Sequence, residues 1–326
     1  MKILVTGAAG FVGFHTSSRL LQAGHEIVGI DNLNSYYDPA LKAARLDMLG
    51  IRQGFAFERL DLSDRAAVAE IFSKHDFDVV IHLGAQAGVR YSIDNPFAYA
   101  DSNLAGTLTV LEGCRTHRIK HLVYASSSSV YGANRKQPFS VKDPVDHPVS
   151  LYAATKRSNE MMCQSYAHLY GIPITGLRFF TVYGPWGRPD MAYFKFAKAI
   201  VEGAVIDVYN HGDMLRDFTY IDDIVDGIEA ILEKGPLPPN EGEAPHRLYN
   251  LGNNRPERLL DLIENLERLL ERPAKKRFLP MQAGDVLATY ADITETSVDY
   301  GFMPKTDLKT GLAHFSAWFR DFYKAS

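Results

Sequence analysis

Residues 3–13 read ILVTGAAGFVG, an apolar run followed by a Gly-x-x-Gly-x-x-Gly loop that opens an amphipathic segment. This order predicts a strand, a tight loop and a helix. The first glycine permits the turn, the second lets the backbone approach a pyrophosphate, and the third allows close packing of helix on strand. The helix N-terminus then faces the phosphates of a nucleotide. Because turn glycines are common, the loop alone leaves a nucleotide site and an ordinary turn equally open.

A carboxylate at the end of the second predicted strand favours NAD as the ligand. Asp31 follows the apolar run 27–30 and lies 18 residues after Gly13. There it can accept hydrogen bonds from the adenosine ribose hydroxyls, and its charge repels the 2′-phosphate of NADP. The three residues that follow include no Arg to receive that phosphate. The alternative role of Asp31 is to start an Asp-Asn turn, and Asp61 could cap a helix or border adenine.

Outward from this loop, short apolar runs alternate with helical patterns, which is typical of parallel βαβ units. The predicted strands are 3–5, 27–30, 55–60, 79–83, 121–125 and 174–179, and the predicted helices are 11–23, 65–75, 96–116 and 151–170. The run 79–81 has no polar alternation, as expected for a central strand covered on both faces. We therefore expect an α/β fold with a doubly wound (Rossmann) parallel sheet. A smaller domain follows, over the carboxyl ends of the strands.

Composition excludes several other classes of protein. The 326 residues are 46% hydrophobic and 23% charged, which indicates a folded globule with a sizeable core. A formal net charge of −4 argues against nucleic acid as a partner. Cys114 and Cys163 are too few for a disulfide framework, and the His spacing predicts no metal site. The short apolar run at the N-terminus predicts neither a signal peptide nor a membrane anchor, so we expect a cytoplasmic protein.

A second pattern supplies a candidate catalytic group. Tyr152 and Lys156 lie four residues apart and share one face of a predicted helix. A nearby ammonium, like the positive charge of oxidised nicotinamide, favours the phenolate and lowers the pKa of a phenol from about 10. A Tyr-x-x-x-Lys match alone is common, and a surface Tyr beside a solvated Lys is the alternative. Four hydroxyls at 126–129, after a predicted strand, place the pair in a fuller context.

Together, these features resemble an extended short-chain dehydrogenase/reductase of the nucleotide-sugar epimerase or dehydratase type, over nearly the whole chain. The resemblance implies that Tyr152 is the acid/base, that Lys156 holds the nicotinamide ribose, and that Ser127 orients the reacting sugar hydroxyl. It divides the chain into an NAD-binding domain, 1–178, to which later segments return, and a nucleotide-sugar-binding domain, 179–326. The expected cofactor contacts are Gly7, Gly10, Phe11, Val12, Gly13, Asp31, Asn32, Asn34, Asp61, Leu62, Leu83, Ala85, Ala87, Tyr152, Lys156 and Phe179.

The same resemblance narrows the reaction. Dehydratases carry Asp-Glu where this chain has Ser128 and Ser129, and UDP-glucuronate decarboxylases carry Glu at the second position. Without these carboxyls, epimerisation remains, and the segments 82–90, 178–191 and 281–286 are similar to UDP-glucuronate 4-epimerases. We expect conversion of UDP-glucuronate to UDP-galacturonate through a transient 4-keto sugar, with NAD as cofactor. The alternatives are a UDP-glucose/UDP-galactose 4-epimerase, a UDP-glucuronate decarboxylase, a non-catalytic NAD sensor and an assembly protein.

A uronate substrate also requires a pocket for its carboxylate, which hydroxyl donors and a cation can supply. Arg188 is the candidate cation and Arg216 matches the diphosphate-binding Arg of the family, although a surface salt bridge is an alternative for Arg90 and Arg188. The helices 96–116 and 151–170 resemble those that form homodimers in the family. The expected substrate contacts are Arg90, Ser127, Ser128, Ser129, Thr181, Arg188, Lys195, Arg216 and Asp285.

Overall fold

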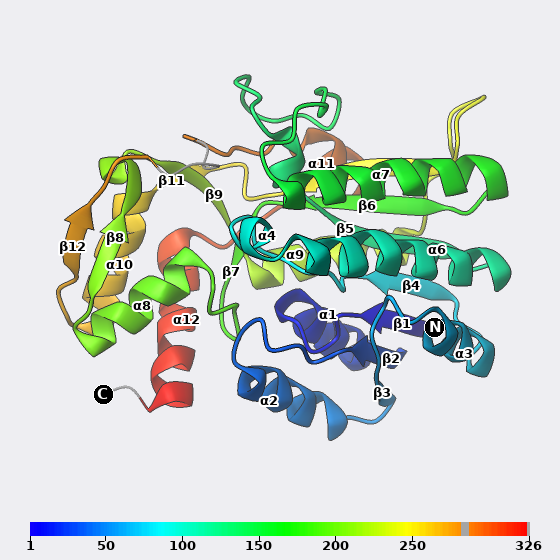
Figure 1. The fold of residues 1–326 in the computed structure, drawn as a ribbon, viewed down its shortest axis with the longest axis horizontal. Helices are drawn as coiled ribbons and strands as arrows, with labels where there is room; N and C mark the ends of the chain where they lie inside the picture. The colour runs from blue at the N-terminus through cyan, green and yellow to red at the C-terminus, as the bar shows by residue number, and fades with distance from the viewer. Residues whose placement is uncertain (282–286, 325–326) are drawn as a thin grey trace.

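A parallel sheet of seven strands forms the centre of the computed structural model, which describes residues 1–281 and 287–324 (Figure 1). The strand order is β10-β6-β5-β4-β1-β2-β3, and every neighbouring pair is parallel. The strands are β1 (Lys2–Thr6), β2 (Glu26–Asp31), β3 (Phe55–Arg59), β4 (Val79–His82), β5 (His121–Ser127), β6 (Ile174–Phe179) and β10 (His246–Leu251). The expected doubly wound α/β fold is confirmed, and a segment from the second half of the chain completes the sheet.

Helices cover both faces of this sheet because successive strand residues point to opposite sides. Ile3 and Val5 belong to the core beneath α1 (Phe11–Gln22) and α9 (Ile221–Lys234), whereas Leu4 belongs to the core on the other face. The other face is covered by α3 (Arg65–Lys74), α6 (Gly106–Thr116) and α7 (Leu151–Tyr170). The helix α2 (Pro39–Gly50) follows β2 and contacts α1.

The smaller part of the molecule holds two further sheets beyond the carboxyl ends of the large one (Figure 1). One has the order β11-β9-β7 and the other pairs β12 with β8. Their strands are β7 (Thr181–Tyr183), β8 (Val205–Val208), β9 (Leu215–Tyr220), β11 (Pro256–Arg258) and β12 (Lys275–Phe278). Its helices are α8 (Ala192–Glu202), α10 (Leu259–Leu270) and α12 (Leu308–Tyr323), whereas α11 (Thr294–Tyr300) packs against α9 and β10 of the larger part.

The expected helix 96–116 is the one element that differs clearly from its prediction. It consists of α5 (Pro96–Tyr99), a π-helical turn (Ala100–Ala105) and α6, and α4 (Tyr91–Asp94) precedes it. The wider π turn accompanies the buried side chain of Asn103, whose amide nitrogen donates to the Gln86 carbonyl (3.0 Å) and to Thr155 Oγ1 (3.0 Å). These partners lie far away in the sequence, so the local helical pattern does not reveal the turn.

No helix within 1–281 or 287–324 combines the length and the apolar character needed to cross a bilayer.

Candidate active site

The glycine loop between β1 and α1 forms one wall of a cavity of about 890 Å³ at the carboxyl ends of the strands. Gly7 has φ +70°, and a Cβ there would lie 2.8 Å from the Cα of Gly84. A Cβ on Gly13 would lie 2.1 Å from the Gly7 carbonyl oxygen. Glycine is therefore required at both positions for the close packing of the loop, whose glycines also line the cavity and lead into the first turn of α1. This is the cradle that a pyrophosphate requires, so the residues fit NAD.

At one end of the cavity the side chain of Asp31 makes the turn contact considered for it and also lines the cavity, while its contact with the ribose stays a prediction. Its Oδ1 accepts a hydrogen bond from the backbone N–H of Leu33 (2.8 Å), and the residue lines the cavity. Asp61 lies alongside, where its Oδ2 accepts a hydrogen bond from the side-chain amide of Asn32 (2.7 Å). The structure adds a cation that the run after Asp31 does not contain. The Nζ of Lys42, on α2, lies 3.6 Å from Asp31 Oδ1 and also lines the cavity.

The catalytic candidates come from β5 and from the first turns of α7. Ser127 ends β5, and its Oγ donates to Ser129 Oγ (3.1 Å). Ser150 caps α7 by accepting a hydrogen bond from Ala153 N–H (3.1 Å), and this cap fixes the turn that carries Tyr152. The side chain of Lys156 returns toward the sheet, where its Nζ donates to the Ala125 carbonyl (3.0 Å).

Burial governs the charge state of both catalytic candidates on α7. It raises the pKa of Tyr152, although a hydrogen bond with Ser127 and the charge of Arg188 act in the opposite direction. Burial also lowers the pKa of Lys156 to about 8, so the ammonium still predominates at neutral pH. The expected lowering of the Tyr152 pKa by Lys156 and by the nicotinamide stays a prediction.

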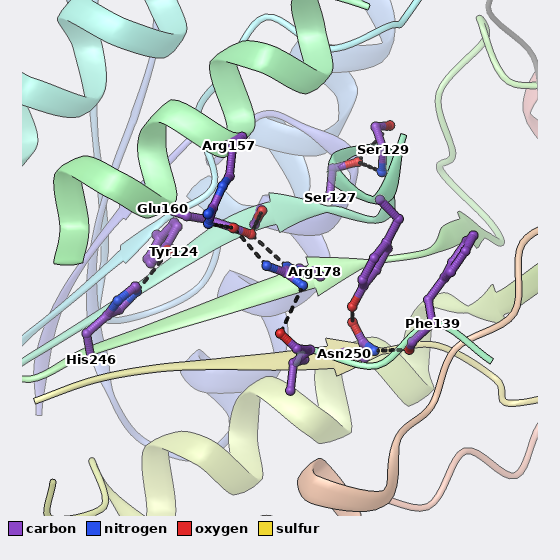
Figure 2. A network of polar contacts seen from close by, with 12 residues as sticks. Tyr124, Ser127, Ser129, Phe139, Arg157, Glu160, Arg178, His246 and Asn250 are labelled. Atoms are coloured by element: carbon purple, nitrogen blue, oxygen red, sulfur yellow. Dashed lines mark hydrogen bonds and ion pairs between the residues drawn. The ribbon is translucent and has the colours of Figure 1, made fainter. Parts of the chain in front are cut away.

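A buried ion pair holds α7 against the sheet behind these groups (Figure 2). Arg178 on β6 donates to both carboxylate oxygens of Glu160, from Nε (2.8 Å) and from a terminal nitrogen (2.9 Å). Each of the two side chains is only 1% exposed. Ser126 Oγ donates to Glu160 as well (2.7 Å). Because Glu160 lies one turn beyond Lys156 and Ser126 precedes Ser127, the pair ties the two catalytic segments together.

Arg188 lies in the cavity, but it is engaged by protein groups. Its Nε donates to Asp190 Oδ1 (3.0 Å), and the hydroxyl of Tyr36 donates to the other oxygen of that carboxylate (3.1 Å). The nearby carboxylate of Asp190 neutralises the positive charge of Arg188. A salt bridge does form, as the alternative reading allowed, but it lies in the cavity and the Arg188 side chain is 23% exposed.

The expected residues converge on this cavity. Asp285 lies outside the described residues, and all the others line it: Gly7, Gly10, Phe11, Val12, Gly13, Asp31, Asn32, Asn34, Asp61, Leu62, Leu83, Ala85, Ala87, Arg90, Ser127, Ser128, Ser129, Tyr152, Lys156, Phe179, Thr181, Arg188, Lys195 and Arg216. Sequence reasoning missed Tyr36, Lys42 and Asp190, which line it too. Asp190 had a usable signal, since it stands two residues after a candidate Arg, whereas Tyr36 and Lys42 had none. No cluster of metal-ligating side chains occurs in the described part of the chain.

Comparisons with known proteins agree with this geometry. The model of the family described as "NAD dependent epimerase/dehydratase family" matches residues 3–252. UDP-glucuronate 4-epimerase 1 of Arabidopsis thaliana is 48% identical, over 99% of this chain and 77% of that protein. The crystal structure of the Bacillus cereus UDP-glucuronic acid 4-epimerase with UDP-glucuronic acid and NAD superposes with a TM-score of 0.90, at 35% identity, over 99% of this chain and 100% of that one. A UDP-glucose 4-epimerase from Thermotoga maritima, with UDP-glucose, gives 0.86 at 29% identity, over 99% and 100%.

Proposed function

This chain belongs to the NAD dependent epimerase/dehydratase family, and from that membership we propose that it interconverts UDP-glucuronate and UDP-galacturonate by inverting C4. It is an NAD-dependent nucleotide-sugar epimerase. The observation that carries the choice of a uronate is the hydroxyl-rich end of the cavity. Ser128, Ser129 and Thr181 line it, and the two serines stand where the resemblance places the carboxyls of dehydratases and decarboxylases. The similarity to relatives named as UDP-glucuronate 4-epimerases supports the same choice.

Three side chains carry the proposed proton transfer. Bound NAD would supply the acceptor, and later the donor, of the hydride at the sugar carbon. Tyr152 Oη removes the proton of the C4 hydroxyl as the C4–H bond breaks, which leaves a ketone, and gives the proton back when the alcohol re-forms. Ser127, whose interaction with Tyr152 acts to lower the pKa of that phenol, orients the reacting hydroxyl. Lys156 holds the nicotinamide ribose from its place beside the Ala125 carbonyl and keeps a positive charge near the phenol.

The carboxylate must be controlled while C4 is a ketone, because it is then β to a carbonyl. If the C5–C6 bond breaks, carbon dioxide leaves and the electron pair becomes an enolate, which ends in a pentose. We assign the restraint of this carboxylate to Ser128, Ser129 and Thr181, with Arg188 as the cation. Since Asp190 already neutralises Arg188, directional hydrogen bonds rather than net charge hold the substrate. We assign the binding of the nucleotide part of the substrate to Arg90, Lys195 and Arg216.

Proton NMR of UDP-glucuronate incubated with the protein, without added reductant, tests the proposal. We expect UDP-galacturonate as the product and no turnover of UDP-glucose. A nucleotide pentose as the main product would identify a decarboxylase, and turnover of UDP-glucose alone a hexose epimerase. Tyr152→Phe should lower kcat by about 10³-fold. The matched control is Tyr166→Phe on the same helix, whose hydroxyl binds Glu112 (2.6 Å) outside the cavity and whose loss should leave kcat unchanged.

We also propose a cytoplasmic homodimer. The thiols of Cys114 and Cys163 are free and buried, as suits a reducing compartment. Helices α6 and α7 lie next to each other on one side of the molecule (Figure 1). They carry apolar side chains that are at least one-third exposed, namely Leu108, Leu151, Met161, Leu169 and Tyr170. A second copy of the chain would cover this face.

A further inference from the structure

Arg45 on α2 is a fully buried cation whose hydrogen bonds reach two loops of the active site. One terminal nitrogen donates to the carbonyl of Ala9 in the glycine loop (2.8 Å) and to the hydroxyl of Tyr37 (2.8 Å). The other donates to the carbonyls of Trp186 (2.5 Å) and Gly187 (3.2 Å). All four acceptors are neutral. The described residues that line the cavity do not include Arg45. Arg45 therefore lies behind the cavity wall and acts on the site through the residues that it contacts.

Such an arrangement costs stability, because a buried guanidinium is ordinarily paired with a carboxylate. Backbone carbonyls compensate the charge only in part, and the Nε of Arg45 has no hydrogen-bond partner. The guanidinium instead provides several hydrogen-bond donors in one fixed arrangement. Its planar fork of donors fixes several acceptors at once, which the single ammonium of a lysine cannot do. The benefit of this Arg therefore lies in the relative position of the two loops.

The second loop needs this support. Trp186 has φ +61°, a left-handed conformation that is strained for a bulky residue and persists only where the surroundings hold it. His15 on α1 bonds the preceding carbonyl, that of Pro185, through Nε2 (2.9 Å). Burial lowers the pKa of His15 to about 4, so the ring is neutral and Nε2–H is the donor. The carbonyls of residues 185–187 thus all accept hydrogen bonds from side chains of α1 and α2, the helices next to the glycine loop. The next residue is Arg188.

We propose that Arg45 is a positioning residue that couples the glycine loop to the segment carrying Arg188, so that seating of the dinucleotide sets the orientation of Arg188. The link is short. A displacement of the Ala9 carbonyl moves the guanidinium, and the same rigid group carries the carbonyls of Trp186 and Gly187 with it. Arg188 then points its hydrogen-bond donors toward the uronate end of the cavity only when the cofactor side is in place. The catalytic readout of this coupling rests on the proposed function.

The product ratio tests the coupling, because it does not depend on how much of a variant is folded. Arg45→Lys keeps the charge and removes the fork, and Arg45→Gln removes the charge. The control is Arg52→Lys, just after α2, where Arg52 donates to the Ser18 carbonyl (3.1 Å) and touches neither loop. Proton NMR with UDP-glucuronate should show the pentose share rising at least threefold for both Arg45 variants and unchanged for the control. A merely structural role lowers both products in proportion, and an unchanged share overturns the proposal.

Hydrogen–deuterium exchange supplies a readout that needs no turnover. In the wild type, NAD should slow amide exchange in residues 184–190 at least threefold, and Arg52→Lys should behave alike. Arg45→Lys should lose this protection while still binding NAD, and retention of the full protection overturns the coupling. The two hypotheses fail separately. If the wild type does not convert UDP-glucuronate, the proposed function is wrong, whereas the exchange experiment still decides the role of Arg45.

Discussion

At the scale of single residues, Lys156 carries a positive charge at a buried position, where no bulk water stabilises that charge. Its ammonium is buried, and burial lowers its pKa to about 8 from the ordinary 10.5. The folded state therefore binds this proton less tightly than the unfolded state does. Below pH 8 the buried charge destabilises the fold, and this penalty is relieved as pH rises from about 8 to 10.5.

Because burial of the Lys156 charge destabilises the fold at neutral pH, we can predict the effect of Lys156→Met. The variant should lose at least 10²-fold in kcat, yet its free energy of unfolding at pH 7 should exceed the wild-type value by about 3 kcal/mol. The difference should shrink between pH 8 and 10.5. Urea unfolding at several pH values measures it, with Lys198→Met, an exposed lysine on α8, as the control. A variant less stable than the wild type at pH 7 would contradict the argument.

A second residue pair bears on the choice of cofactor. Lys42 is held by Asp31 and by Asn34, whose Oδ1 it approaches to 3.1 Å. With Asp31→Asn, the repulsion of a 2′-phosphate disappears and Lys42 becomes available as its partner. We expect the Kd for NADP to fall at least tenfold, and the further change Lys42→Met to cancel the gain. Calorimetric titration with NAD and NADP tests this. Equal NADP affinity in both variants would show that Lys42 plays no part.

At the scale of elements, the Glu160–Arg178 pair joins α7 to β5 and β6 (Figure 2). Removing one partner leaves the other charge buried and unpaired, so Glu160→Ala should lower the free energy of unfolding by about 3–5 kcal/mol. The double variant Glu160→Leu/Arg178→Leu should recover most of this loss. Glu70→Ala, which removes an exposed i,i+4 pair with Lys74, should change it by less than about 1 kcal/mol in urea unfolding. Additive effects in the double variant would contradict the prediction.

Elements with local signals could be predicted from the sequence. The helix α7 begins after Ser150 and ends at Gly171, whose φ of +65° is the expected left-handed cap. The positions of β1 to β6 along the chain follow from apolar runs in the same way. The π turn at 100–105 could not be predicted, because the contacts of Asn103 that accompany it, with Gln86 and Thr155, involve residues far away in the sequence. The positions of Lys42 and Arg45 depend in the same way on where α2 packs, and that packing has no local signature.

At the scale of the whole molecule, the exposed apolar side chains of α6 and α7 predict a dimer. Met161→Glu and Leu169→Glu, on α7, place charges on a face that a second copy would cover. Light scattering after size exclusion should show a wild-type dimer and monomeric variants. Val298→Glu and Met303→Glu change side chains that are 76% and 79% exposed but lie elsewhere, and should leave the dimer intact. A wild-type monomer would refute this assembly.

We propose that the division of the chain near residue 179 separates the binding of NAD from that of the sugar, with 221–251 returning to the first part. The ion pairs of Arg19 on α1 with Asp226 (2.8 Å) and Glu229 (2.7 Å) on α9 anchor the returning segment. The same connection brings β10 to the edge of the large sheet beside β6. The two functional regions are therefore interleaved in the sequence, even though the sheets that build them are separate.

This interleaving constrains how the protein is made. During translation, residues 1–180 emerge with β6 as an unpaired edge, and its partner β10 ends only at residue 251. Open strand edges attract other chains, so the nascent polypeptide passes through an aggregation-prone interval until the ribosome has released His246–Leu251. A gene truncated at the apparent domain boundary would make a product held permanently in that vulnerable state.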